Sequence, residues 1–216
     1  NQMKKLTQAE YLPIEKLKPF EGHPFYVKDD EDMEQLTESI RQQGVLNPIM
    51  VRPLDTGEYE VISGHRRLHA CKKAGIEMIP AFVCSMDRSE AVVAMVDSNL
   101  HREKLLPSEK AFAYKMKMDA MKKQGGRWDL TSNPVGGKLK GIETAEIIGE
   151  EAGESANQVR RYIRLNELTD ELLEFVDEGK IGMRPAVELS YLQEDEMRDL
   201  VDFIDDEEVF LSQIGR

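Results

Sequence analysis

The sequence has few cysteines, few aromatic residues and no long apolar run. Its two cysteines, Cys71 and Cys84, form no Cys-x-x-Cys pair, which argues against a disulfide framework and favours a reduced, cytoplasmic setting. No apolar stretch approaches the roughly 18 residues that a membrane span needs, and no signal peptide is visible, so we expect no membrane partner. Because 40% of the 216 residues are hydrophobic, the chain can still bury one or two cores.

Basic charge is also scarce, since 29 Lys and Arg face 41 Asp and Glu and the net charge is −12. The deficit is local. Residues 167–216 hold 16 acidic and 4 basic side chains, whereas residues 99–140 hold 10 basic and 4 acidic ones. Local field governs binding more than the sum of charges does, so the acidic total does not exclude a nucleic-acid partner.

The most informative stretch, Ser63-Gly64-His65-Arg66-Arg67, joins a strand pattern to a helix pattern that ends at Ala74. Small residues at such a turn let a ligand approach the backbone, and the free N–H groups of a helix N-terminus attract anions. Two adjacent arginines add permanent charge and several donors. The stretch therefore predicts a phosphate-binding site.

Residues 1–103 carry the alternating short strand and helix patterns of an α+β domain. After turn and extended signals in residues 1–30, the expected elements are a capped helix at 29–44, a hairpin from 45–53 and 59–62, a helix at 64–74, a strand at 79–83 and a helix at 88–100.

Residues 104–216 predict an all-α domain. Its first helix is expected from Pro107 to about Lys123, with Phe112 inward and its lysines outward, followed by a Gly-rich loop at 124–141. Further helices are expected at 169–177, 185–192 and 194–206.

Residues 143–165 match the spacing of a helix-turn-helix. This motif needs a small residue in the first helix, a glycine four residues later at the turn and apolar anchors in the second helix; Gly149, Gly153, Val159 and Tyr162 occupy these positions. The outward face of the second helix carries no acid, and its side chains are types that contact bases and phosphates: Ser155, Asn157, Gln158, Arg160, Arg161 and Arg164. This face predicts binding of double-stranded DNA; an ordinary helical hairpin with a cationic face is the alternative.

In this order the motifs resemble those of the ParB family of DNA-partition proteins over nearly the whole chain. Gly64 to Arg67 is similar to the family's Gly-Glu-Arg-Arg box, Asn99 to Arg102 to its Glu-Asn-x-x-Arg box, and residues 38–53 to the helix and strand that precede them. The resemblance implies a ParB/sulfiredoxin-like mixed α/β nucleotide-binding domain followed by a helix-turn-helix domain. It also implies that CTP and Mg²⁺ bind at Ser63, Gly64, His65, Arg66, Arg67, Asn99 and Arg102, with Asn99 as a Mg²⁺ ligand.

The function implied by the resemblance is recognition of a centromere-like DNA site and CTP-driven closure of a sliding clamp in chromosome or plasmid segregation. The implied partners are a ParA-type ATPase and a second copy of the chain as a homodimer, and the implied location is the nucleoid in the cytoplasm. The family's C-terminal dimerisation domain has no counterpart in this sequence, so we expect a truncated chain.

Two residues depart from the family where the chemistry is expected, since His65 and Ser98 stand in place of glutamates. Magnesium prefers carboxylate oxygen, so nucleotide binding is expected while slow CTP hydrolysis is left open. The first alternative is therefore a ParB-like DNA-binding regulator or adaptor that has lost nucleotide switching.

A redox enzyme is a further alternative, because sulfiredoxin shares the N-terminal fold. Its nucleophilic cysteine would fall at Gly64, so the nucleophile is missing, and Cys71 is expected to be a buried structural thiol. A metal site built from His65, His69 and Cys71 lacks further ligands at suitable spacing.

Overall fold

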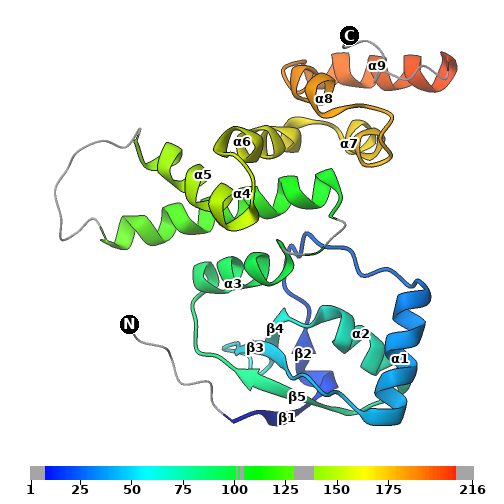
Figure 1. Cartoon of the computed structure of the whole chain (residues 1–216), viewed down its shortest axis with the longest axis vertical. Coiled ribbons are helices and arrows are strands. Elements are labelled where there is room, and N and C mark those ends of the chain that lie inside the picture. Colours follow the sequence, from blue (N-terminus) through cyan, green and yellow to red (C-terminus); the bar gives the residue numbers. More distant parts are fainter. Residues whose placement is uncertain (1–7, 101, 103–104, 129–138, 208–216) are drawn as a thin grey trace. The chain divides into compact units, whose positions relative to one another are not determined.

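The computed structural model describes residues 8–100, 102, 105–128 and 139–207. The chain divides into two compact units, Asn1–Asn99 and Leu100–Arg216. The first unit combines a sheet with helices, and the described part of the second contains helices only (Figure 1). The predicted α+β fold class is therefore confirmed.

A five-stranded sheet in the order β1-β5-β3-β4-β2 forms the centre of the first unit. The predicted hairpin is present, since β3 (Ile49–Pro53) pairs antiparallel with β4 (Tyr59–Ser63). Strand β5 (Met78–Val83) runs parallel to β3. The edge strands β1 (Glu10–Pro13) and β2 (Leu17–Lys18) come from the segment in which only turn and extended signals were recognised. They are too short to show an alternating pattern.

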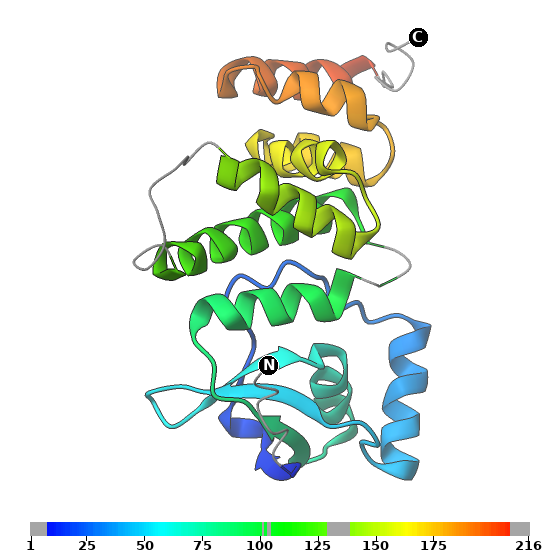
Figure 2. The ribbon, with the colours of Figure 1, turned by 60° about the vertical axis from the view of Figure 1, so that its left-hand side comes forward.

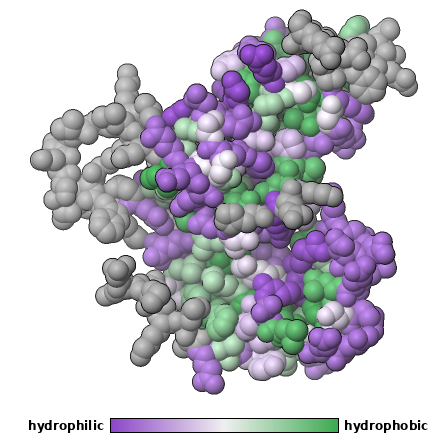
Figure 3. Space-filling model, viewed as in Figure 1, coloured by the Kyte–Doolittle hydropathy of each residue, from purple (hydrophilic) through white to green (hydrophobic). Residues whose placement is uncertain are grey.

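Three helices accompany this sheet: α1 (Glu31–Gln43), α2 (His65–Ala74) and α3 (Arg88–Leu100). Helices α1 and α2 lie side by side in both ribbon views (Figures 1 and 2). Met33 and Ile40 of α1 share a buried core with Leu68 and Cys71 of α2 and with Ile49 of β3. Hydrophilic residues cover the outer side of α1 (Figure 3). This core fixes the start of α2 against the sheet.

The second unit contains six α-helices in its described part: α4 (Pro107–Trp128), α5 (Leu139–Ala152), α6 (Ala156–Arg164), α7 (Asp170–Asp177), α8 (Met183–Leu189) and α9 (Glu194–Glu207). Tyr114, Ala145, Ile148 and Val159 form one core among α4, α5 and α6. A second core is built around Leu165, Leu172 and Met197. None of the helices in the described ranges has the length and apolarity of a membrane span.

Three expectations for this unit were wrong. The loop predicted at 124–141 is shorter, because α4 continues to Trp128 and α5 begins at Leu139. Extending a formed helix gains a hydrogen bond per residue, which offsets a glycine cost of about 1 kcal/mol. Lys117 is also not outward, since its side chain is only 1% exposed, while Phe112 is exposed. The buried side of α4 runs through Tyr114 and Lys117 instead.

Candidate functional site

The turn between β4 and α2 requires a glycine at position 64. Gly64 has φ 103°, a conformation that costs a side-chain-bearing residue strain. A Cβ atom there would lie 2.5 Å from Cγ2 of Ile49, which is closer than real contacts allow. A glycine is therefore required at position 64 both by the backbone conformation and by the close packing of Ile49 against the turn.

The start of α2 suits an anion. No side chain caps this helix, and its first turn holds no acid. The start of α1 is different, because Asp30 accepts a hydrogen bond from the Met33 N–H at 3.0 Å and acidic residues fill the first turn. The positive end of the α2 dipole therefore meets no carboxylate from its own helix.

The two arginines of the turn have different surroundings. Nη1 of Arg67 donates hydrogen bonds to the carbonyl oxygens of Asn47 and Pro48, the latter at 2.7 Å, and burial lowers the pKa of Arg67. Arg66 makes no hydrogen bond or ion pair with any other residue that the structure describes. Arg67 thus braces the segment before β3, and Arg66 is the guanidinium available to an anion.

His65, which stands in place of the family's glutamate, is 7% exposed. Its Nε2 accepts a hydrogen bond from the Phe20 N–H at 3.4 Å, and its ring centroid lies 3.8 Å from that of His23. His65 therefore connects the start of α2 to the segment before α1.

Asn99 and Ser98 lie at the end of α3 and are bonded within it. Nδ2 of Asn99 donates to the Met95 carbonyl at 2.8 Å, and Oγ of Ser98 donates to the same carbonyl at 2.9 Å. No hydrogen bond joins Asn99 to the turn among the described residues, and Arg102 belongs to the second unit. The structure thus groups Ser63 to Arg67 at one turn, with Asn99 on a different element.

The donor set for a cation is small. Oδ1 of Asn99 is the atom that could face Mg²⁺, because Nδ2 is already bonded. No group of three His, Cys, Asp or Glu residues suited to a metal occurs in the ranges that the structure describes. Magnesium often takes one or two protein ligands and completes its shell with phosphate and water, so the chemistry of an amide oxygen is compatible with a site shared with a triphosphate; the side chain of Asn99 is 4% exposed. Cys71 is buried, and this burial raises its thiol pKa, as expected for a structural cysteine.

Helices α5 and α6 approach each other closely at Gly149, and Gly153 forms the turn between them. Gly153 has φ 70° at the turn, and a Cβ atom on Gly149 would lie 2.6 Å from the backbone oxygen of Glu154. Val159 of α6 is fully buried against α4 and α5. The residues at the predicted spacing therefore form the contact between the two helices.

The predicted DNA-binding residues do not all share one environment. Asn157, Arg160 and Arg161 are exposed, and Nη1 of Arg160 donates to Oδ1 of Asn157 at 3.0 Å. Ser155 is also exposed and caps α6 by accepting a hydrogen bond from the Gln158 N–H at 3.1 Å; the Gln158 side chain is half-buried. These residues cluster around the first two turns of α6.

Arg164 is held by other parts of the second unit. Its Nε donates to Oγ of Ser190 at 2.9 Å, and its Nη2 donates to the Ser190 carbonyl at 2.7 Å. The guanidinium lies 4.1 Å from the centroid of the Tyr191 ring. Arg164 therefore connects the end of α6 to the end of α8.

The sequence interpretation missed the charged side chains that join α4 to the end of α5 and to the turn before α6. Lys110 forms an ion pair with Glu154 and lies 5.0 Å from the Tyr162 ring, while Lys117 forms an ion pair with Glu151. Burial raises the pKa of Tyr114, which lies between these lysines on α4. The signal was present, because positions 110, 114 and 117 have the spacing of a buried helical stripe.

Comparison with known proteins identifies the first unit. Residues 1–100 match the model of the ParB N-terminal domain. The chain belongs to the ParB family. A nucleoid occlusion protein from Listeria monocytogenes is 29% identical over 193 residues, which cover 89% of this chain and 61% of that protein. A probable chromosome-partitioning protein ParB from Vibrio cholerae is 31% identical over 182 residues, covering 84% of this chain and 55% of that one.

Solved ParB structures share the fold. The C-terminally truncated Caulobacter crescentus ParB in complex with the centromeric parS site has a TM-score of 0.54 and 24% identity, covering 94% of this chain and 95% of that one. A Pnob8-like ParB N-domain has a TM-score of 0.57 and 21% identity, covering 92% and 84%. The chain spans about 60% of the length of the first curated relatives it matches.

Proposed function

We propose that this ParB-family chain recognises a specific double-stranded DNA site of the centromere type through a helix-turn-helix formed by α5 and α6. The observation that carries this proposal is the open, acid-free face at the start of α6, with Asn157, Arg160 and Arg161 exposed. Arginine and asparagine are residues that read base edges in the major groove, and arginine also contacts phosphates. The structure of Caulobacter ParB, which shares this fold, is a complex with the centromeric parS site, and this supports a centromere-type DNA as the ligand.

The supporting contacts of α6 are consistent with such a role. The turn at Gly153, the Arg164 contacts with Ser190 and the ion pair between Lys110 and Glu154 hold both ends of α6 in place. A recognition helix must present its side chains in a fixed register, because a shift of about 1 Å disrupts bidentate base contacts.

The DNA proposal is tested by selecting sites from a random duplex library with the wild-type chain. We expect one enriched sequence, to which Arg160→Ala and Arg161→Ala each bind more weakly by about 1–3 kcal/mol. Arg184→Ala is the matched control, since this exposed arginine lies on α8 outside the proposed interface. The absence of any enriched site, or selection unchanged in the Arg160→Ala and Arg161→Ala double variant, would reject the assignment.

The second part of the proposal is that CTP binds at the turn of residues 63–67. The uncapped, acid-free start of α2 and the available guanidinium of Arg66 support binding of a triphosphate. Arg67 would hold the preceding loop, and Asn99 and Arg102 would complete the phosphate and Mg²⁺ site.

Nucleotide binding is tested by isothermal titration with CTP and Mg²⁺, compared with ATP, GTP and UTP. We expect Arg66→Ala to weaken CTP binding by roughly tenfold or more, because one charge-assisted contact is lost. Lys72→Ala, which removes an exposed cation from the last turn of the same helix, should leave it unchanged. Equal losses in both variants would indicate general electrostatics rather than a site at the turn.

The proposal extends to partition itself. In it, CTP closes a sliding clamp between two copies of the chain, a ParA-type ATPase is the partner in chromosome or plasmid segregation, and the protein acts on the nucleoid. CTP-stimulated crosslinking between N-terminal units, greater on circular DNA that carries the selected site than on DNA without it, is the expected signature of the clamp.

A DNA-binding regulator without nucleotide switching is the second candidate, and two observations favour it. His65 is buried against Phe20, and the Ser98 hydroxyl is bonded back into α3, so neither position offers a carboxylate to a cation. Site-specific DNA binding combined with no heat of CTP binding would select this candidate. Hydrolysis of CTP is not part of the proposal, since neither position supplies the family's glutamate.

A further inference from the structure

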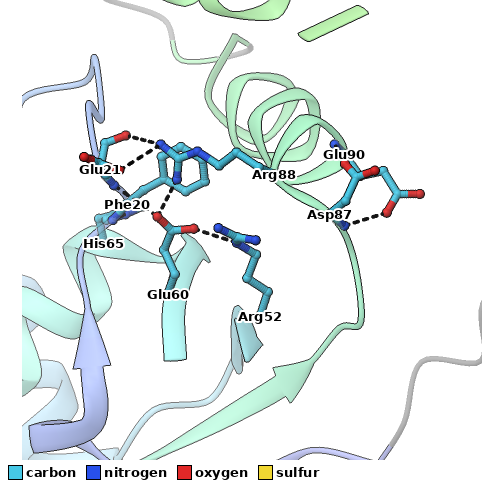
Figure 4. Close-up of polar contacts among 8 residues, drawn as sticks. All are labelled: Phe20, Glu21, Arg52, Glu60, His65, Asp87, Arg88 and Glu90. Atoms are coloured by element: carbon cyan, nitrogen blue, oxygen red, sulfur yellow. Dashed lines mark hydrogen bonds and ion pairs between the residues drawn. The ribbon is translucent and has the colours of Figure 1, made fainter. Parts of the chain in front are cut away.

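A buried carboxylate lies beside the turn of residues 63–67, called here the phosphate turn after its proposed ligand. It has no role in the nucleotide site described above. Glu60 of β4 is 4% exposed and collects three donors (Figure 4). Nε of Arg52 on β3 donates to it at 2.6 Å, the Glu21 N–H donates at 3.2 Å, and Nη1 of Arg88 forms an ion pair with it. Glu60 therefore joins both strands of the hairpin to the segment before α1 and to the first residue of α3.

Arg88 holds the same segment through three further contacts, one of which is an ion pair between its Nη2 and Oε2 of Glu21 at 3.8 Å. Its Nη2 donates to the Glu21 carbonyl at 2.8 Å, and its guanidinium lies 4.1 Å from the centroid of the Phe20 ring. The Phe20 N–H in turn donates to Nε2 of His65 at the start of α2. A continuous set of contacts therefore runs from the phosphate turn through Phe20 and Glu21 to the start of α3 (Figure 4).

The charge state of Glu60 keeps this set of contacts together. Burial opposes ionisation of Glu60, but the hydrogen bonds from Arg52, Glu21 and Arg88 outweigh it and hold the pKa of Glu60 below its usual value. An ionised carboxylate can satisfy two arginines at once, because its two oxygens offer about four acceptor positions. A neutral amide of the same shape would leave Arg52 without its counter-charge and Arg88 with only the exposed carboxylate of Glu21.

The contacts of Glu60 bear on function because they fix the start of α3. The helix begins with Arg88 in the Glu60 cluster, and its penultimate residue is Asn99, which we propose for the phosphate and Mg²⁺ site. A rigid helix transmits a displacement at one end to the other, so the contacts of Arg88 set where Asn99 lies.

We propose that Glu60 is a positioning residue of the nucleotide site, coupling the phosphate turn to α3 through Arg88, Phe20 and Glu21. A nucleotide bound at residues 63–67 shifts or stiffens Phe20 through His65, and the Glu60–Arg88 pair passes this change to α3. The inference rests on the proposed binding of CTP and adds a route by which that binding is communicated within the first unit.

The test uses the full chain with Glu60→Gln, Arg88→Gln and the double variant. Calorimetry measures CTP affinity in the presence of Mg²⁺, and amide hydrogen exchange follows residues 88–96 with and without CTP. In the wild type we expect CTP to slow exchange in α3. Glu60→Gln should bind CTP at least tenfold more weakly, and its α3 should no longer respond even when CTP is saturating. The double variant should be no worse than either single variant, because both remove the same connection.

Glu58→Gln is the matched control, since Glu58 is a neighbouring carboxylate whose ion pair with Lys18 lies at the surface. It should behave as the wild type does. Thermal unfolding shows whether Glu60→Gln is folded. If it is not, Arg88→Gln is used alone, because the Arg88 side chain is 40% exposed and its replacement disturbs the core less. The coupling is overturned if the Glu60 and Arg88 variants keep wild-type affinity and the response of α3, or if their effects add. A wild-type chain that binds no CTP would instead reject the proposed nucleotide function and this inference with it.

Discussion

At the scale of single residues, Gly64 decides whether the phosphate turn can form. Its positive φ is one reason why a residue with a side chain is unfavourable there. The clash of a Cβ atom with the Ile49 side chain is a second, independent reason. Gly57 provides a comparison in the same unit, because its φ is 80° but nothing lies within 4 Å of the point that a Cβ atom would occupy. Substitution of Gly57 therefore measures backbone strain alone, whereas substitution of Gly64 measures strain together with a steric clash.

We predict that Gly64→Ala lowers the free energy of unfolding by about 3 kcal/mol, since strain at positive φ adds to overpacking against Ile49. Gly57→Ala should cost about 1 kcal/mol, from strain alone. Urea unfolding of both variants measures the difference. Calorimetry should show weaker CTP binding only for Gly64→Ala. Equal destabilisation of the two variants would contradict the steric argument.

The residue types at the turn could be recognised from the sequence, but their individual roles could not. Arg66 and Arg67 are adjacent and chemically identical, yet Arg67 bonds to two backbone carbonyls while Arg66 is available. Likewise Arg164 matched the DNA-binding pattern, and the fold places it against Ser190 and Tyr191. These assignments depend on partners that are distant in the sequence.

At the scale of elements, the crossing of α5 and α6 is governed by Gly149. A Cβ atom there would meet the backbone of Glu154 at 2.6 Å and that of Ser155 and Ala156 at 3.2 Å. Backbone atoms of a tight turn have little freedom to move aside, so α6 itself would have to shift. Gly182 is different, since the nearest atom to its Cβ position is Cδ of Pro185 at 3.8 Å.

Gly149→Ala is predicted to destabilise the second unit by about 2 kcal/mol, because the overpacking exceeds the gain of about 1 kcal/mol in helix propensity. Affinity for the selected DNA site should also fall at least tenfold, while CTP affinity is unchanged. Gly182→Ala should cost less than about 1 kcal/mol and leave DNA binding intact. Thermal unfolding and fluorescence anisotropy measure the two effects. Wild-type DNA affinity in Gly149→Ala would argue against a fixed crossing as the basis of recognition.

The helices and the three inner strands of the first unit were predicted well, and its two edge strands were not. The helices α1, α2 and α3 and the β3–β4 hairpin lie within a few residues of their expected positions. The edge strands β1 and β2 were missed because four residues and two residues contain too little alternation. Their strand character comes from pairing with β5 and β4, which is a non-local property.

At the scale of the whole molecule, the charge distribution matters more than the net charge. The excess of acids lies in residues 167–216, whereas the exposed start of α6 carries none. Binding of a polyanion by a chain of net charge −12 therefore depends on a local cationic surface, which salt screens.

We predict that affinity for the selected DNA site falls steeply as salt rises, because bound phosphates release counterions. In a plot of log affinity against log salt concentration, replacing both Arg160 and Arg161 by Ala should reduce the slope by about 2 if each neutralises one phosphate. Arg184→Ala should leave the slope unchanged. An unchanged slope accompanied by lost sequence preference would instead place both arginines on base edges.

The sequence by itself determined the fold class, the order of the motifs and the family, because periodicity, glycine positions and short boxes are local properties of the chain. Only the tertiary structure decided which charged side chains are exposed and able to bind a ligand, and which are held in ion pairs inside the protein. Lys117 is buried with Glu151, and Glu60 gathers Arg52 and Arg88 beside the phosphate turn. The physical reason is that burying a charge requires a partner, and the fold brings these partners together from distant parts of the sequence.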